Sequence, residues 1–308
     1  MKQPELILAI VDPEMHQSAA TRRAIELARR CGARLHLCMP VFDLRIHAVA
    51  DLVDPEVEQL ARQHYIDQRM RWLAEWSAEL ASQNLRTSCE VLWARKAHEA
   101  VINTVRELSP DLVVKDLKRE SFLRRWSTIK TSDWQLIRLC PVPLMLVQED
   151  APILPARVAA AVDPVHPQAR PTELDDRIVR SALPMAMAAN AELELVHVFP
   201  YRRDDEGMSA KMDEVIERLR REDAEAFASF ARGYSVPAER RVLLGGDPVK
   251  ELLEHVEASG VDLLVIGSQY RGGFERLLLG SNAEGLISNA NCDLLLVRPS
   301  GFTGEPAV

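Results

Sequence analysis

An internal repeat with a constant spacing limits the possible folds of this chain more than any other feature of its sequence. Three separated motifs each return 151 residues later: Ile10–Pro13 as Ala161–Pro164, Val91–Leu92 as Val242–Leu243, and Asp111–Val114 as Asp262–Val265. This period is too long for a solenoid repeat, so it indicates duplication of a whole domain. The length of 308 residues also fits about two domains.

The join between the two copies is expected near Gln148–Pro155, where QEDAPILP combines charge with two prolines. The predicted domains are therefore residues 1–150 and 151–308.

Within each half, short apolar runs rich in Val, Ile and Leu alternate with longer amphipathic stretches. This pattern is typical of βαβ units around a parallel sheet. We predict two tandem α/β domains of Rossmann-like type, each a five-stranded parallel sheet of order 3-2-1-4-5 flanked by helices. The expected strands are 6–11, 34–41, 88–93, 111–115 and 142–147, then 157–162, 192–199, 239–244, 262–267 and 293–297.

Two apolar stripes with helical spacing are interpreted as core rather than as parts of a cofactor site. Their members are Val57, Leu60, Ala61, Met70, Leu73, Ser77 and Leu80, and later Met212, Val215, Ile216, Leu219, Phe227 and Phe230.

The composition argues against several classes of function. A net charge of −8 disfavours general nucleic-acid binding, which depends on clustered Lys and Arg. The apolar runs are far shorter than the ~20 residues that span a bilayer, and the first residues lack a signal-peptide pattern, so a cytoplasmic protein is expected. The five cysteines show no metal-ligand spacing and are interpreted as buried free thiols.

A ligand-binding site is expected where the strand order of a doubly wound sheet reverses, outside the carboxyl ends of strands 1 and 4. Asp163 ends a first strand and Gly267 ends a fourth, so the two residues should border one crevice. Gly280, Ser281 and Asn282 precede a helical pattern, whose N-terminus favours an anion. The alternative interpretation of these three residues is a simple helix cap.

The second half resembles the universal stress protein family. Its signature is Gly-x2-Gly-x9-Gly-Ser/Thr after strand 4, and Gly267, Gly280 and Ser281 occupy three of the marked positions. Gly246-Asp247-Pro248 and the segment Cys292–Pro299 also read like that family. The first half resembles the degenerate first domain of the two-domain E type of this family, through Val91–Trp93 and Thr131–Arg138 among other segments.

The resemblance implies a nucleotide site in the second half, with ATP and Mg²⁺ as the possible ligand. The candidate ligand-binding residues are Asp163, Val198, Ile266, Gly267, Gln269, Tyr270, Gly280, Ser281 and Asn282. Tyr270 replaces the second signature glycine, where a side chain crowds the phosphates and a left-handed backbone costs ~1–2 kcal/mol. Weak ATP binding is therefore expected.

The first half departs further from the signature. Asp116 stands at the position of Gly267, and Lys130-Thr131 at that of Gly280-Ser281, so a phosphate-bearing ligand is expected in the second half alone. A nearby basic group, Lys118, Arg119, Arg124, Arg125 and Lys130, is interpreted as a solvated loop.

The leading hypothesis is a cytoplasmic, non-catalytic stress-response protein that binds a small ligand. The alternatives are a slow ATPase or nucleotide-dependent switch, and a nucleic-acid-associated stress protein. No catalytic or metal-binding residues are nominated. Because single-domain relatives form homodimers, the two halves are expected to pair as a pseudo-dimer within the chain, and a homodimer of the whole chain is a further possibility.

Overall fold

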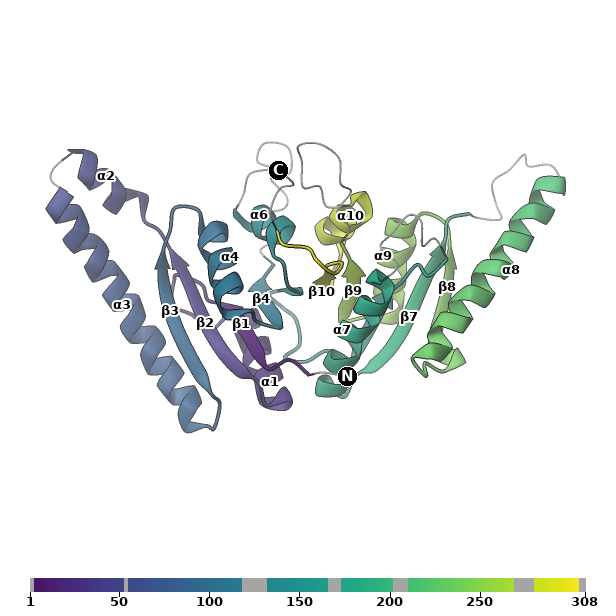
Figure 1. Ribbon diagram of the computed structural model, residues 1–308, viewed down its shortest axis with the longest axis horizontal. Coiled ribbons are helices and arrows are strands. Elements are labelled where there is room, and N and C mark those ends of the chain that lie inside the picture. The colour runs from purple at the N-terminus through teal and green to yellow at the C-terminus, as the bar shows by residue number, and fades with distance from the viewer. Residues whose placement is uncertain are drawn as a thin grey trace. The chain divides into compact units, whose positions relative to one another are not determined.

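The computed structural model describes residues 3–52, 55–117, 132–165, 173–201, 210–268 and 280–304. The chain divides into two units, Gln3–Ile153 and Leu154–Val308, which are described separately below (Figure 1).

The first unit contains a parallel sheet in which β1 lies between β2 and β4. The strand order is β3-β2-β1-β4-β5, and Leu8 of β1 pairs with His36 on one side and Val113 on the other. This is the predicted order 3-2-1-4-5. The elements are β1 (Leu6–Ile10), α1 (Ala19–Cys31), β2 (Arg34–Val41), α2 (Leu44–Leu52), α3 (Pro55–Ser82), β3 (Thr87–Trp93), α4 (Ala97–Leu108), β4 (Leu112–Asp116), α6 (Ser132–Leu139) and β5 (Leu144–Val147).

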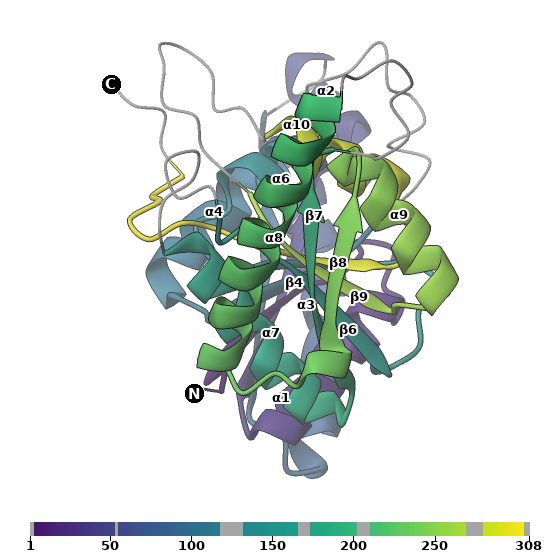
Figure 2. The ribbon, with the colours of Figure 1, turned by 90° about the vertical axis from the view of Figure 1, so that its right-hand side faces the viewer.

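The second unit has the same topology, with β6 between β7 and β9 in the order β8-β7-β6-β9-β10. Helices α8 and α9 lie on opposite sides of β7 and β8 (Figure 2). The elements are β6 (Arg157–Ala161), α7 (Leu174–Ala189), β7 (Glu192–Phe199), α8 (Ala210–Gly233), a 3₁₀ turn at Ala238–Arg240, β8 (Arg241–Gly245), α9 (Pro248–Ser259), β9 (Leu263–Gly267), α10 (Ser281–Asn289) and β10 (Asp293–Val297).

Strands covered by helices on both faces are apolar along their whole length, because neither face meets water. All residues of β1 and β10 are buried, as are the first four of β9. This continuous burial explains why apolar runs located the strands in the sequence. Three strands, β2, β7 and β10, have the predicted bounds, and the others differ by one or two residues at one or both ends.

A recurring aspartate fixes the start of the first strand in each unit. Oδ2 of Asp111 accepts hydrogen bonds from the backbone N–H groups of Glu5 and Leu6, at 2.8 and 3.0 Å. Oδ2 of Asp262 accepts the equivalent bonds from Ala156 and Arg157, at 2.7 and 2.9 Å. The repeat at 151 residues thus includes a contact between strands 1 and 4 in each unit.

The interpretation of both apolar stripes as core was wrong for the first turns of α3 and α8. Leu73 and Phe227 are buried, but Leu60 is 71% exposed and Met212 is 50% exposed. The reason is length, because α3 with 28 residues is about 42 Å long, whereas β3 beside it has 7 residues and spans about 23 Å. Figure 1 shows α3 beside β3 and α8 beside β8.

The five cysteines are unpaired, but Cys31 and Cys89 are only partly buried. Burial raises the pKa of the Cys292 thiol to about 12, so it stays protonated at neutral pH. Among the helices that the structure describes, none has both the length and the apolar composition of a bilayer span.

Candidate functional site

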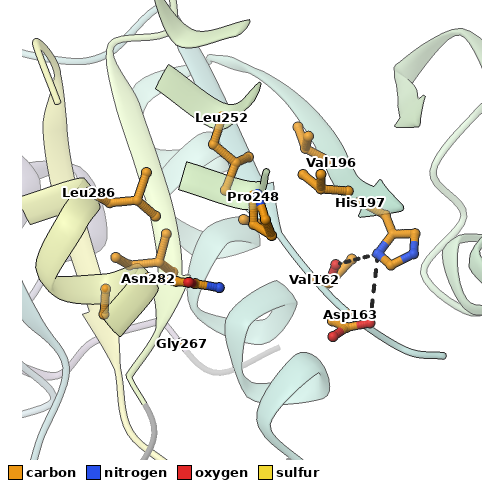
Figure 3. A pocket seen from close by; sticks show the side chains of 13 residues that line it. Val162, Asp163, Val196, His197, Pro248, Leu252, Gly267, Asn282 and Leu286 are labelled. Carbon is orange, nitrogen blue, oxygen red and sulfur yellow. Dashed lines mark hydrogen bonds and ion pairs between the residues drawn. The ribbon is translucent and has the colours of Figure 1, made fainter. Parts of the chain in front are cut away.

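A small cavity lies in the second unit at the carboxyl ends of β6 and β9, where the strand order reverses (Figure 3). Its volume is about 100 Å³. Three strands and two helices supply its wall: Ala161, Val162, Asp163, Val196, His197, Val198, Pro248, Leu252, Ile266, Gly267, Asn282, Ala283 and Leu286.

Asp163 is the acidic group of this cavity, and it follows β6 directly. Its backbone N–H donates to Oδ1 of Asp175 at 2.8 Å, and Asp175 belongs to the first turn of α7. This bond ties the turn after β6 to the start of the next helix. The Asp163 side chain is 24% exposed, so its carboxylate is accessible to a ligand.

His197 lies beside Asp163, and Figure 3 shows its ring directed at the end of β6. The side chain is 1% exposed. Nδ1 lies 3.0 Å from the carbonyl oxygen of Val162 and 3.9 Å from Oδ1 of Asp163, while Nε2 lies 3.3 Å from Oδ2 of Asp223 on α8. Both ring nitrogens of this buried histidine therefore lie within hydrogen-bonding distance of an oxygen, and the carboxylate of Asp163 lies beside the ring.

Helix α9 forms the opposite wall, and the Gly246-Asp247-Pro248 motif positions its first turn. Gly246 has φ +139°, a conformation that L side chains rarely adopt, and a Cβ there would lie 2.7 Å from Oε1 of Glu251. Asp247 caps the helix by accepting the N–H of Lys250 at 2.9 Å, and Pro248 occupies the first turn. Pro248 and Leu252 then face the cavity (Figure 3).

Gly267 ends β9 at a point where helix α7 crosses close to the strand. A Cβ at this position would lie 2.8 Å from Cδ2 and 2.9 Å from Cγ of Leu174, which is fully buried. The absence of a side chain at Gly267 therefore allows α7 to pack. The sequence interpretation assigned this glycine to the ligand loop, and tertiary packing is a second reason for it.

Helix α10 begins at Ser281, with Gly280 as its N-cap residue and Asn282 on the cavity wall. The unpaired N–H groups of a first turn and the helix dipole attract an anion. Glu284, also in this first turn, opposes that attraction. Gly280 has φ −57° and ψ 145°, which is a common conformation for any residue. Its backbone angles therefore do not require glycine.

The structure brings five of the nine predicted site residues to one cavity: Asp163, Val198, Ile266, Gly267 and Asn282. Gly280 and Ser281 lie at the adjoining helix start, and Gln269 and Tyr270 fall outside the described residues. The sequence analysis did not name His197, Pro248, Leu252 or Leu286 as site residues. The Gly246-Asp247-Pro248 motif is the sequence feature that could have identified Pro248 and Leu252, the two lining residues from α9.

Comparisons with known proteins place both halves in one family. The sequence pattern described as the Universal stress protein family matches residues 5–148 and again 157–298. Universal stress protein E of Salmonella typhi is 26% identical, over 96% of this chain and 95% of that protein. Universal stress protein E of Escherichia coli K12 is 25% identical, over 96% and 94% respectively.

Solved structures share the fold. A putative universal stress protein from Pseudomonas aeruginosa UCBPP-PA14 superposes with a TM-score of 0.74 at 21% identity, covering 97% of this chain and 95% of that one. A protein of unknown function from P. aeruginosa PAO1 gives a TM-score of 0.75 at 20% identity, covering 97% and 94%.

Proposed function

The chain belongs to the universal stress protein family, and from this membership we propose that it is a non-catalytic stress-response protein whose second half binds a small ligand. The observation that carries the proposal is the cavity that joins Asp163, Val198, Ile266, Gly267 and Asn282 at the switch point of the second sheet. Ligands of doubly wound sheets bind at this point.

A nucleotide fits part of this site. Asp163 offers a hydrogen-bond acceptor for a sugar hydroxyl, the apolar wall of Val198, Ile266 and Leu252 suits a base, and the start of α10 attracts phosphate. However, the described cavity lining contains neither Lys nor Arg to balance a triphosphate. We therefore propose that ATP with Mg²⁺ is a weak ligand of the second half.

Calorimetric titration of the full chain with ATP and Mg²⁺ tests this proposal. The unaltered protein should bind weakly, and Tyr270→Gly should bind more tightly by about tenfold, because the substitution restores the signature glycine and removes a side chain from the loop. Tyr201→Gly is the control, because Tyr201 is 49% exposed and is not among the described lining residues of the cavity, although its ring contacts Phe199.

The same titration distinguishes the second-half site from other sites. Asp163→Asn should weaken ATP binding to the Tyr270→Gly protein, whereas Asp12→Asn in the first half should leave it unchanged. Tight ATP binding by the unaltered protein would contradict our interpretation of the loop. Release of inorganic phosphate during the titration would contradict the non-catalytic assignment.

We further propose that the two family domains pair with each other as a pseudo-dimer within the chain. Fusion of two copies makes a contact between subunits intramolecular, which raises its effective concentration. Small-angle scattering of the full chain should then fit one compact particle, and two well-separated lobes would contradict the proposal.

A further inference from the structure

The first unit, whose loop sequence departs from the family signature, has a cavity of its own. It lies at the carboxyl ends of β1 and β4 and has a volume of about 260 Å³, larger than the cavity of the second unit. Its described lining comprises Ile10, Val11, Asp12, Pro13, Pro40, Ala97, His98, Val101, Lys115, Asp116, Asp133 and Leu136. Among the residues that the structure describes, the loss of the signature has therefore not filled the crevice with side chains.

The apolar part of this lining corresponds to the second unit position by position. Ile10 and Val11 end the first strand as Ala161 and Val162 do, and each pair precedes an aspartate. Val101 on α4 lies 151 residues before Leu252 on α9. An apolar wall with one acid at the end of strand 1 is thus common to both cavities.

The remaining lining residues differ in charge. Lys115 and Asp116 replace Ile266 and Gly267 at the end of the fourth strand, and Asp133 comes from α6. Nζ of Lys115 lies 3.1 Å from Oδ1 of Asp133, so these two groups neutralise each other. The described part of the lining then has three carboxylates and one ammonium group.

Backbone N–H groups bind the other two carboxylates of the described lining. Oδ1 of Asp116 accepts the N–H of Ala20 at 3.0 Å, in the first turn of α1. Oδ1 of Asp12 accepts the N–H of Glu14 at 2.9 Å, and Nδ1 of the exposed His16 lies 3.9 Å from it. Burial lowers the pKa of His98 below its ordinary value, so this imidazole is neutral at pH 7 and does not offset the carboxylates.

We propose that the cavity of the first unit is a separate binding site for a small organic cation, a molecule with an apolar body and an ammonium group. The apolar wall accepts the body, and Asp12 and Asp116 attract the charged group across a half-buried site, where charges interact more strongly than in water. The same carboxylates repel phosphate. The site is independent of what the second unit binds.

A series of three probes with one shape and different charges tests this proposal. Benzylamine, benzyl alcohol and benzoate are each titrated calorimetrically into the full chain at pH 7. Benzylamine should bind more than about tenfold tighter than benzyl alcohol, and benzoate should not bind measurably. The basic residues between positions 118 and 131 lie outside the described residues, and benzoate is the probe that would detect an anion site built from them.

Conservative variants assign the site to the first unit. Asp116→Asn and Asp12→Asn keep an oxygen that can accept the backbone N–H, so both should fold, yet each should weaken benzylamine binding at least fivefold while benzyl alcohol binding stays unchanged. The matched variant Asp163→Asn, at the equivalent position of the second unit, should have no effect on benzylamine. Equal or tighter binding of benzoate would overturn the proposal, as would an unchanged benzylamine affinity in both first-unit variants or a loss in Asp163→Asn.

Discussion

Gly267 illustrates how one residue can satisfy two requirements that the sequence does not separate. It occupies a signature position after strand 4, and its missing side chain also leaves room for Leu174 of α7. By contrast, Gly246 is required by its backbone conformation, with φ +139°. At the scale of single residues, a glycine in a motif therefore needs a structural explanation before it is assigned to a ligand.

Gly267→Ala should destabilise the protein by about 1–3 kcal/mol, because the added Cβ would lie under 3.0 Å from a buried leucine. Urea unfolding measures this change. Gly233→Ala is the control, since no atom lies within 4 Å of a Cβ at that position, and it should change stability by less than about 0.5 kcal/mol. An unfolding midpoint for Gly267→Ala equal to that of Gly233→Ala would show that α7 shifts to accommodate the added Cβ without a loss in the free energy of unfolding.

At the scale of elements, the first strand of each unit is held at its start by an aspartate that accepts two backbone N–H groups. The strands themselves follow from apolar runs, but the pairing of strand 1 with strand 4 joins residues about 100 positions apart. Asp111 and Asp262 each accept two backbone N–H groups at this point, and hydrogen bonds to a charged group contribute about 1.5–3 kcal/mol.

Asp111→Ala should accelerate amide hydrogen exchange at the start of β1 and leave β6 unaffected, because it removes the acceptor for Glu5 and Leu6. Asp262→Ala should do the reverse, so each variant is the control for the other. Exchange resolved by peptide and mass spectrometry measures both effects. Uniform acceleration across the chain in either variant would mean that the aspartate acts on global stability and not on its own strand.

At the scale of the whole molecule, one buried arginine holds the segment that joins the two repeats. Arg23 of α1 is fully buried and donates from Nη2 to the carbonyl oxygen of Pro152 at 2.6 Å and from Nε to that of Ile153. The prolines of this segment marked it as the join in the sequence, but nothing in the sequence indicated that an α1 side chain binds it.

Arg23→Met should make the joining segment susceptible to thermolysin, which cuts before Ile and Leu, because the carbonyl groups of Pro152 and Ile153 lose their attachment to α1. We expect cleavage into two fragments at a rate about tenfold above that of the unaltered protein. Arg22→Met, at the neighbouring exposed position, is the control. Equal rates for the two variants would show that the contacts of Arg23 do not protect the join.

The sequence by itself determined the duplication, the α/β class, the strand order and nearly all strand positions. These properties can be predicted because they follow from patterns of residues along the chain. Strands buried on both faces must be apolar throughout, and a duplicated domain repeats its landmarks at one spacing. The strand order in turn located the crevice that Asp163 and Gly267 border.

Only the tertiary structure decided which apolar stripes are buried, which glycine is needed for packing and what lines the cavity of the first unit. Leu60 and Leu73 lie on one helical stripe, yet only Leu73 meets the sheet, because α3 is longer than its neighbouring strand. Asp12, Lys115 and Asp133 come from separate parts of the chain, and their summed charge exists only once the fold brings them together. Burial and electrostatics depend on distances in space, which residue spacing along a chain does not contain.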